Sequence, residues 1–158
     1  MSLWVLEGMD RVGKSTTADL LRRRYKAEYI HMTVPARWHV PYSYFTEVLH
    51  LLMSTYGKNV VMDRSFYGEA VWPHVYNRVP LLDKQNMYDL IHIAKILHKQ
   101  EVQCIYMYDP NTEAHKNRLL QDKEPLYDYD KVSLLYKQMA IDHKFSTIDL
   151  PGAIKLWT

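Results

Sequence analysis

The sequence predicts an α/β fold in which a central parallel sheet of about five strands lies between layers of flanking helices. Three observations support this class. Short apolar runs alternate with longer segments of helical period, the first apolar run leads straight into a loop bounded by glycines, and the prolines fall between or at the ends of the periodic segments. With 158 residues, 47% of them hydrophobic, and no linker or repeat, the chain is expected to form one domain over residues 1–158.

The expected strands are the short apolar runs Leu3–Leu6, Tyr29–Met32, Val60–Met62, Val102–Tyr108 and Thr147–Leu150. Apolar residues at helical spacing predict core-facing helices around residues 45–56, 87–97 and 132–143. Two more helices are expected, one directly after the first loop and one over Asn111–Leu120. Strands that alternate with helices in this way favour parallel pairing in three layers.

Composition narrows the function classes. The chain carries 20 Lys and Arg against 18 Asp and Glu, a net charge of +2 that suits phosphate ligands but falls short of a strongly basic nucleic-acid surface. Its single cysteine, Cys104, excludes an intrachain disulfide and favours a reducing compartment. Because no signal peptide or run of membrane-spanning length is found, we expect a cytoplasmic protein with no membrane partner.

The first loop has the pattern Gly8-x-x-x-x-Gly13-Lys14-Ser15, which is typical of a phosphate-binding loop, or P-loop. Its backbone N–H groups can surround phosphate oxygens, while Lys14 reaches the β- and γ-phosphates from what we expect to be a solvent-facing loop. The Ser15 hydroxyl is aimed at a Mg²⁺ ion. A side chain at either glycine would fill the phosphate space or forbid the turn. The motif predicts a P-loop NTPase fold that uses ATP and Mg²⁺.

A second motif, Asp63-Arg64, follows the apolar run Val60–Met62. In a doubly wound sheet, ligands bind beyond the carboxyl ends of the strands, so these two residues are expected beside the P-loop. Phosphoryl transfer needs metal, cations and a group that orients the attacking oxygen. We expect Asp63 to orient the acceptor and to share the Mg²⁺ site with Ser15, and Arg64 to hold the acceptor's anionic group.

The segment from Glu7 to Thr16, followed by Pro35-x-Arg37 and then Asp63-Arg64, resembles thymidylate kinases and the wider thymidylate-kinase-like P-loop kinases. The resemblance implies that Arg11 supports the phosphates during transfer, that Asp10 contacts the acceptor sugar and that Arg37 grips an acceptor monophosphate. Lys14, Arg11, Asp63 and Arg64 are then the catalytic candidates. The resemblance implies an ATP site built from the loop residues Gly8, Asp10, Val12, Gly13, Lys14, Ser15 and Thr16.

The chain departs from thymidylate kinases between its two motifs, because only 49 positions separate Lys14 from Asp63 and no Asn-Arg-Trp-like segment follows Leu52. Asp63-Arg64-Ser65-x-Tyr67 is similar to deoxynucleoside kinases. Residues 65–78 resemble compact bacteriophage P-loop kinases, some of which act on nucleotides and some on hydroxymethyluracil in DNA. This similarity adds Tyr67, Glu69 and Arg78 to the acceptor-side candidates.

Residues 117–127 lie where these kinases place a lid over the nucleotide, and Arg118 and Lys123 are its cations. Arg118 is therefore expected to contact ATP.

Several function classes remain open on the sequence alone. The leading one is an ATP-dependent phosphotransferase for a (deoxy)nucleoside monophosphate, and the motifs favour a thymidylate-like pyrimidine as that acceptor. The alternatives are a kinase of 5-hydroxymethyluracil in phage DNA, a deoxynucleoside kinase, and a nucleotide-binding switch or hydrolase without an acceptor. The partner is thus a nucleotide or a modified base, with DNA as one option. The oligomeric state is open, and a homodimer is one possibility.

Overall fold

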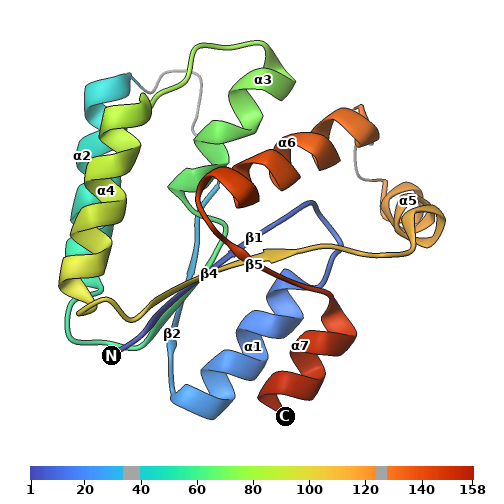
Figure 1. Ribbon diagram of the computed structural model, residues 1–158, viewed down its shortest axis with the longest axis horizontal. Coiled ribbons are helices and arrows are strands. Elements are labelled where there is room, and N and C mark those ends of the chain that lie inside the picture. Colours follow the sequence, from blue (N-terminus) through green and yellow to red (C-terminus); the bar gives the residue numbers. More distant parts are fainter. Residues whose placement is uncertain (34–39, 124–127) are drawn as a thin grey trace.

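The computed structural model describes residues 1–33, 40–123 and 128–158. Its centre is a five-stranded, fully parallel sheet in the order β2-β3-β1-β4-β5 (Figure 1). The strands are β1 (Leu3–Glu7), β2 (Glu28–His31), β3 (Val60–Asp63), β4 (Val102–Met107) and β5 (Ser146–Ile148). The expected α/β class and parallel sheet are therefore confirmed, and β1 lies in the middle with β3 on one side and β4 on the other.

The connecting segments are mostly helical. They comprise α1 (Lys14–Tyr25), α2 (Pro41–Ser54), the short 3₁₀ helix η1 (Phe66–Ala70), α3 (Trp72–Tyr76), α4 (Lys84–Leu97), α5 (Thr112–Gln121), α6 (Tyr129–Asp142) and α7 (Leu150–Trp157). None of the helices in the described part of the chain combines the length and hydropathy needed to cross a bilayer.

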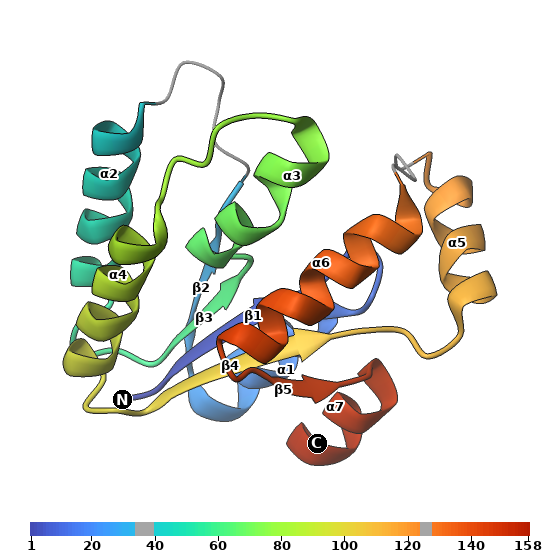
Figure 2. The same ribbon diagram turned by 45° about the horizontal axis from the view of Figure 1, so that its top comes forward.

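Helices cover both faces of the sheet, as Figures 1 and 2 show. Helices α1 and α7 lie on one face, where they pack against Trp4 and Leu6 of β1. Helices α2, α4 and α6 lie on the other, where the core includes Leu3 and Val5 of the same strand. Because successive side chains of a strand point to opposite faces, a strand buried throughout supplies both cores.

Local sequence explains where the helices begin. Asp83, Asn111, Asp128 and Asp149 each precede a helix and accept a hydrogen bond from a backbone N–H in its first turn. Helix α2 instead begins at Pro41, a residue whose missing N–H costs nothing at a helix start.

The last strand and helix differ from the expectation. The apolar run Thr147–Leu150 was expected as strand, but β5 ends at Ile148 and Leu150 opens α7. The cause is Asp149, whose side chain caps α7 by accepting a 2.8 Å hydrogen bond from the Gly152 N–H. Helix α7 was not predicted, because its first residue, Leu150, was assigned to the strand and the residues after it were given no element.

Candidate active site

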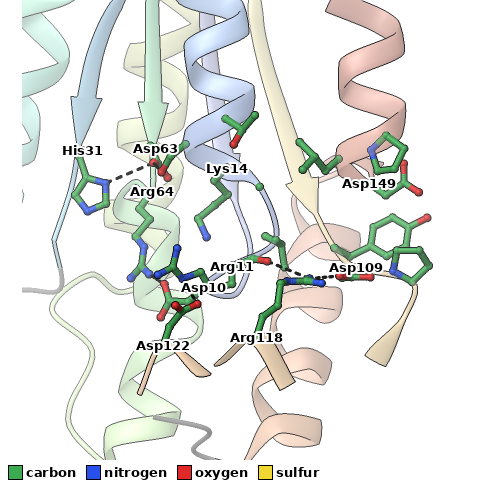
Figure 3. Close-up of a pocket in the computed structure, with 18 residues that line it drawn as sticks. Asp10, Arg11, Lys14, His31, Asp63, Arg64, Asp109, Arg118, Asp122 and Asp149 are labelled. Atoms are coloured by element: carbon green, nitrogen blue, oxygen red, sulfur yellow. Dashed lines mark hydrogen bonds and ion pairs between the residues drawn. The ribbon is translucent and has the colours of Figure 1, made fainter. Parts of the chain in front are cut away.

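The P-loop joins β1 to α1 at the carboxyl edge of the sheet (Figure 3). The chain order around β1 reverses here, since β3 pairs on one side and β4 on the other. This is the switch point at which open parallel sheets bind ligands. An open cavity of about 710 Å³ lies against the loop, and residues 10–16 form one wall of it. The cavity is large enough for a nucleotide.

The two motif glycines hold conformations that suit no other residue well. Gly8 has a φ of +149°, and a Cβ there would come within 2.3 Å of the Met107 carbonyl oxygen on β4. Gly13 caps α1 with a φ of +100°, so a side chain there would be strained. Glycine at both ends therefore lets the loop turn sharply, pack against β4 and present its backbone to the cavity.

Lys14 is the first residue of α1 and is only 6% exposed. The expectation that it sits on a solvent-facing loop is therefore wrong. Its Nζ donates hydrogen bonds to the carbonyl oxygens of Gly8, at 2.9 Å, and Met9. Burial lowers the pKa of Lys14 to about 8, although the negative charges of Asp63 and Glu7 oppose this shift. Lys14 thus places a buried positive charge in the wall of the cavity.

Ser15 and Asp63 lie together, as the sequence predicted. The Ser15 hydroxyl donates a 2.9 Å hydrogen bond to Asp63 Oδ2, and the Tyr29 hydroxyl donates a second one of 2.9 Å to the same oxygen. Within residues 1–33, 40–123 and 128–158, nothing hydrogen-bonds the other oxygen, Oδ1, although it is buried. A buried carboxylate oxygen without a partner beside a serine hydroxyl fits Mg²⁺, which prefers oxygen ligands.

Arg64 directly follows β3 and forms an ion pair with Asp10 in the P-loop. Its backbone is in the left-handed region, with a φ of +68°, and its N–H donates to the Leu6 carbonyl at 3.0 Å. The guanidinium carbon lies 5.9 Å from the centre of the Trp72 ring. Arg64 lines both the large cavity and a small one beside it, so it stands between the phosphate loop and a neighbouring pocket.

Glu7, the last residue of β1, lines the small cavity and is 1% exposed. Its Oε1 accepts hydrogen bonds of 2.7 Å from both the backbone N–H and the hydroxyl of Ser65. Burial raises the pKa of Glu7 to about 7, although the Ser65 hydrogen bonds and the charges of Lys14 and Arg64 lower it. Glu7 thereby ties the end of β1 to the residues that follow β3.

Helix α5 and the residue that caps its end bring two further charged side chains, Arg118 and Asp122, to the P-loop. The Arg11 Nε lies 3.0 Å from an oxygen of Asp122, which caps the end of α5. Arg118 pairs with Asp109 and also donates a 3.3 Å hydrogen bond to the Arg11 carbonyl oxygen. Arg118 and Arg11 both line the large cavity, and their contacts with ATP stay a prediction.

The other acceptor-side candidates do not line the large cavity in the described part of the chain. Arg37 lies outside the described residues, and so does the end of the expected lid, residues 124–127. Glu69 lines the small cavity and is held by Arg78, with N–O distances of 2.6 and 3.1 Å. Glu69 also accepts a 2.8 Å hydrogen bond from the Leu81 N–H. The Glu69 carboxylate therefore ties η1 to the segment that contains Arg78 and Leu81.

Tyr67 was expected to contact the acceptor, but its side chain lies in the hydrophobic core. Its ring packs against Phe66 and Phe145, with centroids 4.9 and 4.8 Å apart, and its hydroxyl contacts the Cys104 thiol. Tyr67 is not among the described residues that line either cavity. Its aromatic character therefore reflects packing.

The sequence did not single out several residues that line the large cavity: His31, Tyr108, Asp109, Pro110, Asp149, Leu150 and Pro151. Most of them directly follow β4 or β5, or end β2. The rule that ligands bind at the carboxyl edge of a parallel sheet was the signal that could have found them.

No protein-family model matches the chain, and no curated protein sequence does. Solved structures do match. The YorR protein of Bacillus subtilis, in complex with phosphorylated GDP, has a TM-score of 0.75 at 22% identity over 93% of this chain and 84% of that one. A thymidylate kinase of Candida albicans has a TM-score of 0.54 at 18% identity over 99% and 89%.

A deoxyadenosine kinase of M. mycoides with bound dATP has a TM-score of 0.56 at 13% identity, covering 98% of this chain and 96% of that one. The chain shares the fold of these three proteins. At these identities the likeness concerns the fold, and it confirms the three-layer P-loop architecture that the first loop predicted.

Proposed function

We propose that this protein is an ATP-dependent phosphotransferase that phosphorylates a (deoxy)nucleoside monophosphate, with a thymidylate-like pyrimidine as the favoured acceptor. The observation that carries the proposal is the position of Arg64, which stands beside the P-loop and borders both cavities. A hydrolase or nucleotide switch has no need of a cation between the phosphate loop and a second pocket. The fold shared with nucleotide kinases supports the same assignment.

Different groups of the site bind the phosphate donor and the acceptor. The backbone N–H groups of residues 10–15 and the Lys14 ammonium bind the triphosphate. Arg11 adds a guanidinium from within the loop, where it can stabilise charge on the phosphoryl group during transfer. When bound by Ser15 and Asp63, Mg²⁺ supplies charge neutralisation to the phosphates.

The acceptor is expected on the Arg64 side of the loop. One of its oxygens attacks the γ-phosphorus, the bond from that phosphorus to the β–γ bridging oxygen breaks, and ADP leaves. A guanidinium binds phosphate with two parallel hydrogen bonds, which suits Arg64 for a monophosphate acceptor. Asp63 orients the attacking oxygen, or takes its proton where the acceptor is a hydroxyl.

A deoxynucleoside acceptor is the second candidate. The observation that favours it is the ion pair between Arg64 and Asp10, which already neutralises the guanidinium and leaves less need for a phosphate there. The polymer-directed alternative, a kinase of hydroxymethyluracil in DNA, has weaker support. The basic run Arg22–Arg24 lies in the last turn of α1, about 12 to 15 Å along the helix from Lys14, and so away from the phosphate loop that would act on a DNA base.

A substrate panel tests the proposal. Wild-type protein is incubated with MgATP and separate sets of nucleosides, nucleoside monophosphates and hydroxymethyluracil-containing DNA, and the products are identified by mass spectrometry. We expect one phosphate to be added to a pyrimidine monophosphate such as dTMP, with Lys14→Ala as the inactive control. Products from nucleosides alone would favour the deoxynucleoside kinase, and labelling of DNA alone would overturn both small-molecule assignments.

A further inference from the structure

His115 connects helix α5 to the backbone of the P-loop. Its side chain is buried, with the residue 1% exposed, and no role in the proposed chemistry accounts for it. The Nε2 atom lies 2.7 Å from the carbonyl oxygen of Asp10, and the Nδ1 atom lies 2.6 Å from the hydroxyl of Tyr129. The P-loop thus meets helices α5 and α6 at one imidazole, although it lies about 100 residues before them in sequence.

The chemistry of the partners fixes the proton on this ring. A carbonyl oxygen can only accept a hydrogen bond, so Nε2 carries the proton and donates it to Asp10. In the neutral imidazole Nδ1 then accepts, and the Tyr129 hydroxyl is the donor. Tyr129 is the first residue of α6, so the relay links the loop to the two helices on either side of residues 122–128.

The bond to Asp10 sets the orientation of one peptide group. The C=O of Asp10 and the N–H of Arg11 belong to the same planar trans peptide and point in opposite directions. With the carbonyl held toward α5, the Arg11 N–H faces away from that helix. Arg11 also has a φ of +60°, a conformation that L-residues adopt at a cost and that neighbouring contacts must hold.

Space filling does not explain the histidine. His115 and Tyr129 both border a separate cavity of about 240 Å³, which also touches Met9 and Lys137. A residue selected only to fill the core would not leave such a space beside a polar ring. The two short hydrogen bonds are therefore the specific feature of this site.

We propose that His115 is a positioning residue for phosphate binding, which holds the Asp10–Arg11 peptide so that the Arg11 N–H and side chain are ordered before the triphosphate arrives. Tyr129 supports it by keeping the proton on Nε2. The inference rests on the proposed function, because it assigns a role to the loop in binding a triphosphate. It predicts that losing the imidazole N–H disorders the loop and weakens binding and transfer together.

Three variants test the role. His115→Leu keeps the bulk but removes both hydrogen bonds, His115→Gln restores an N–H at similar reach, and Tyr129→Phe removes only the hydroxyl. The matched control is His98→Leu, because His98 is equally buried but bonds Thr55 and the Met1 carbonyl at the opposite edge of the sheet. MgATP affinity is measured by calorimetry, kcat and KM by product formation, and loop order by hydrogen exchange at residues 11–14.

For His115→Leu we expect MgATP affinity and kcat to fall about tenfold or more, with faster exchange at residues 11–14, because the Asp10 carbonyl loses its side-chain partner. His115→Gln should recover most of this loss, and Tyr129→Phe should lie between. His98→Leu should lower the melting temperature without changing these readouts. Equal losses in His98→Leu, or unchanged loop exchange in His115→Leu, would overturn the positioning role.

Different results would refute the proposed function and the role of His115. If wild-type protein neither binds MgATP nor transfers phosphate, the kinase assignment is wrong, whatever the variants do. If wild-type protein binds MgATP and transfers phosphate to an acceptor, and His115→Leu binds MgATP equally well, the kinase assignment stands and the role of His115 is wrong.

Discussion

Replacing Glu7 by Gln should stabilise the protein, and the gain should grow with pH. The Glu7 pKa is raised by burial from 4.5 to about 7 in the folded protein. A carboxyl whose folded pKa lies above its unfolded pKa is favourable when protonated, at low pH. Its contribution to stability is lost as pH rises from 4.5 through 7. Glutamine keeps an oxygen that can accept both Ser65 hydrogen bonds but never ionises.

The size of the effect follows from the shift. Each pH unit of pKa difference corresponds to about 1.4 kcal/mol, so ionised Glu7 costs the folded state about 3 kcal/mol at pH 8. At pH 5 the same linkage gives less than about 1 kcal/mol, because Glu7 is still protonated in the folded protein. Glu7→Gln is therefore expected to raise the melting temperature by about 10 °C at pH 8, and by much less at pH 5.

The assay is urea unfolding at pH 5, 6, 7 and 8, without nucleotide or metal, for wild-type and Glu7→Gln protein. The quantity of interest is the difference between the two free energies of unfolding, because pH-independent effects of the amide cancel when this difference is compared across pH. Glu113→Gln, an exposed carboxylate in the first turn of α5, is the control. A difference that stays constant from pH 5 to pH 8 would refute the buried-carboxyl argument.

Three further predictions concern transfer. Lys14→Ala should abolish phosphoryl transfer while the far-UV circular dichroism spectrum stays unchanged, since the substitution removes a charge that the transition state needs. Near-wild-type turnover in the folded variant would contradict the P-loop assignment. Arg11→Ala should lower kcat by about a thousandfold with a smaller loss of ATP affinity, because a cation of this kind acts mainly in the transition state. A variant that loses ATP affinity but keeps its kcat would exclude that role. Arg64→Lys should raise the acceptor KM or lower its turnover with ATP binding nearly intact, which competition binding can check.

The sequence predicted the parts of the site that are built from contiguous residues. The loop from Gly8 to Ser15 carries its own geometry, and the strand before Asp63 is apolar throughout, so the end of that strand could be placed beside the loop. The Ser15–Asp63 hydrogen bond follows from this placement. Such features depend on local pattern and on one rule of sheet topology.

Contacts between distant segments could not be predicted in the same way. The pairing of Arg11 with Asp122 and the bond from His115 to Asp10 depend on where α5 lies over the loop, which no local pattern encodes. Tyr67 shows the opposite error. The resemblance of its segment to deoxynucleoside kinases and phage P-loop kinases suggested a ligand contact, but the turn of η1 directs its side chain into the core.

The charges of the large cavity explain why a metal belongs in this chemistry. Among the described residues that line it, four are cationic and five are carboxylates: Arg11, Lys14, Arg64 and Arg118 against Asp10, Asp63, Asp109, Asp122 and Asp149. Each of the three arginines is already paired with one of these carboxylates. A bare triphosphate would therefore have to displace carboxylates from Arg11 and Arg118, and the carboxylates of the cavity would repel it.

A divalent ion changes this balance. Bound beside Ser15 and Asp63, it adds positive charge where a buried carboxylate oxygen has no partner in the described chain. Arginines that are held by carboxylates in advance lose less freedom when they exchange to phosphate oxygens, because their side chains are already positioned. The ion pair at Arg11 thus prepares the site for a metal-bound nucleotide, and the ion pair at Arg64 prepares it for the acceptor's phosphate. The same pairs disfavour anions that arrive without a metal.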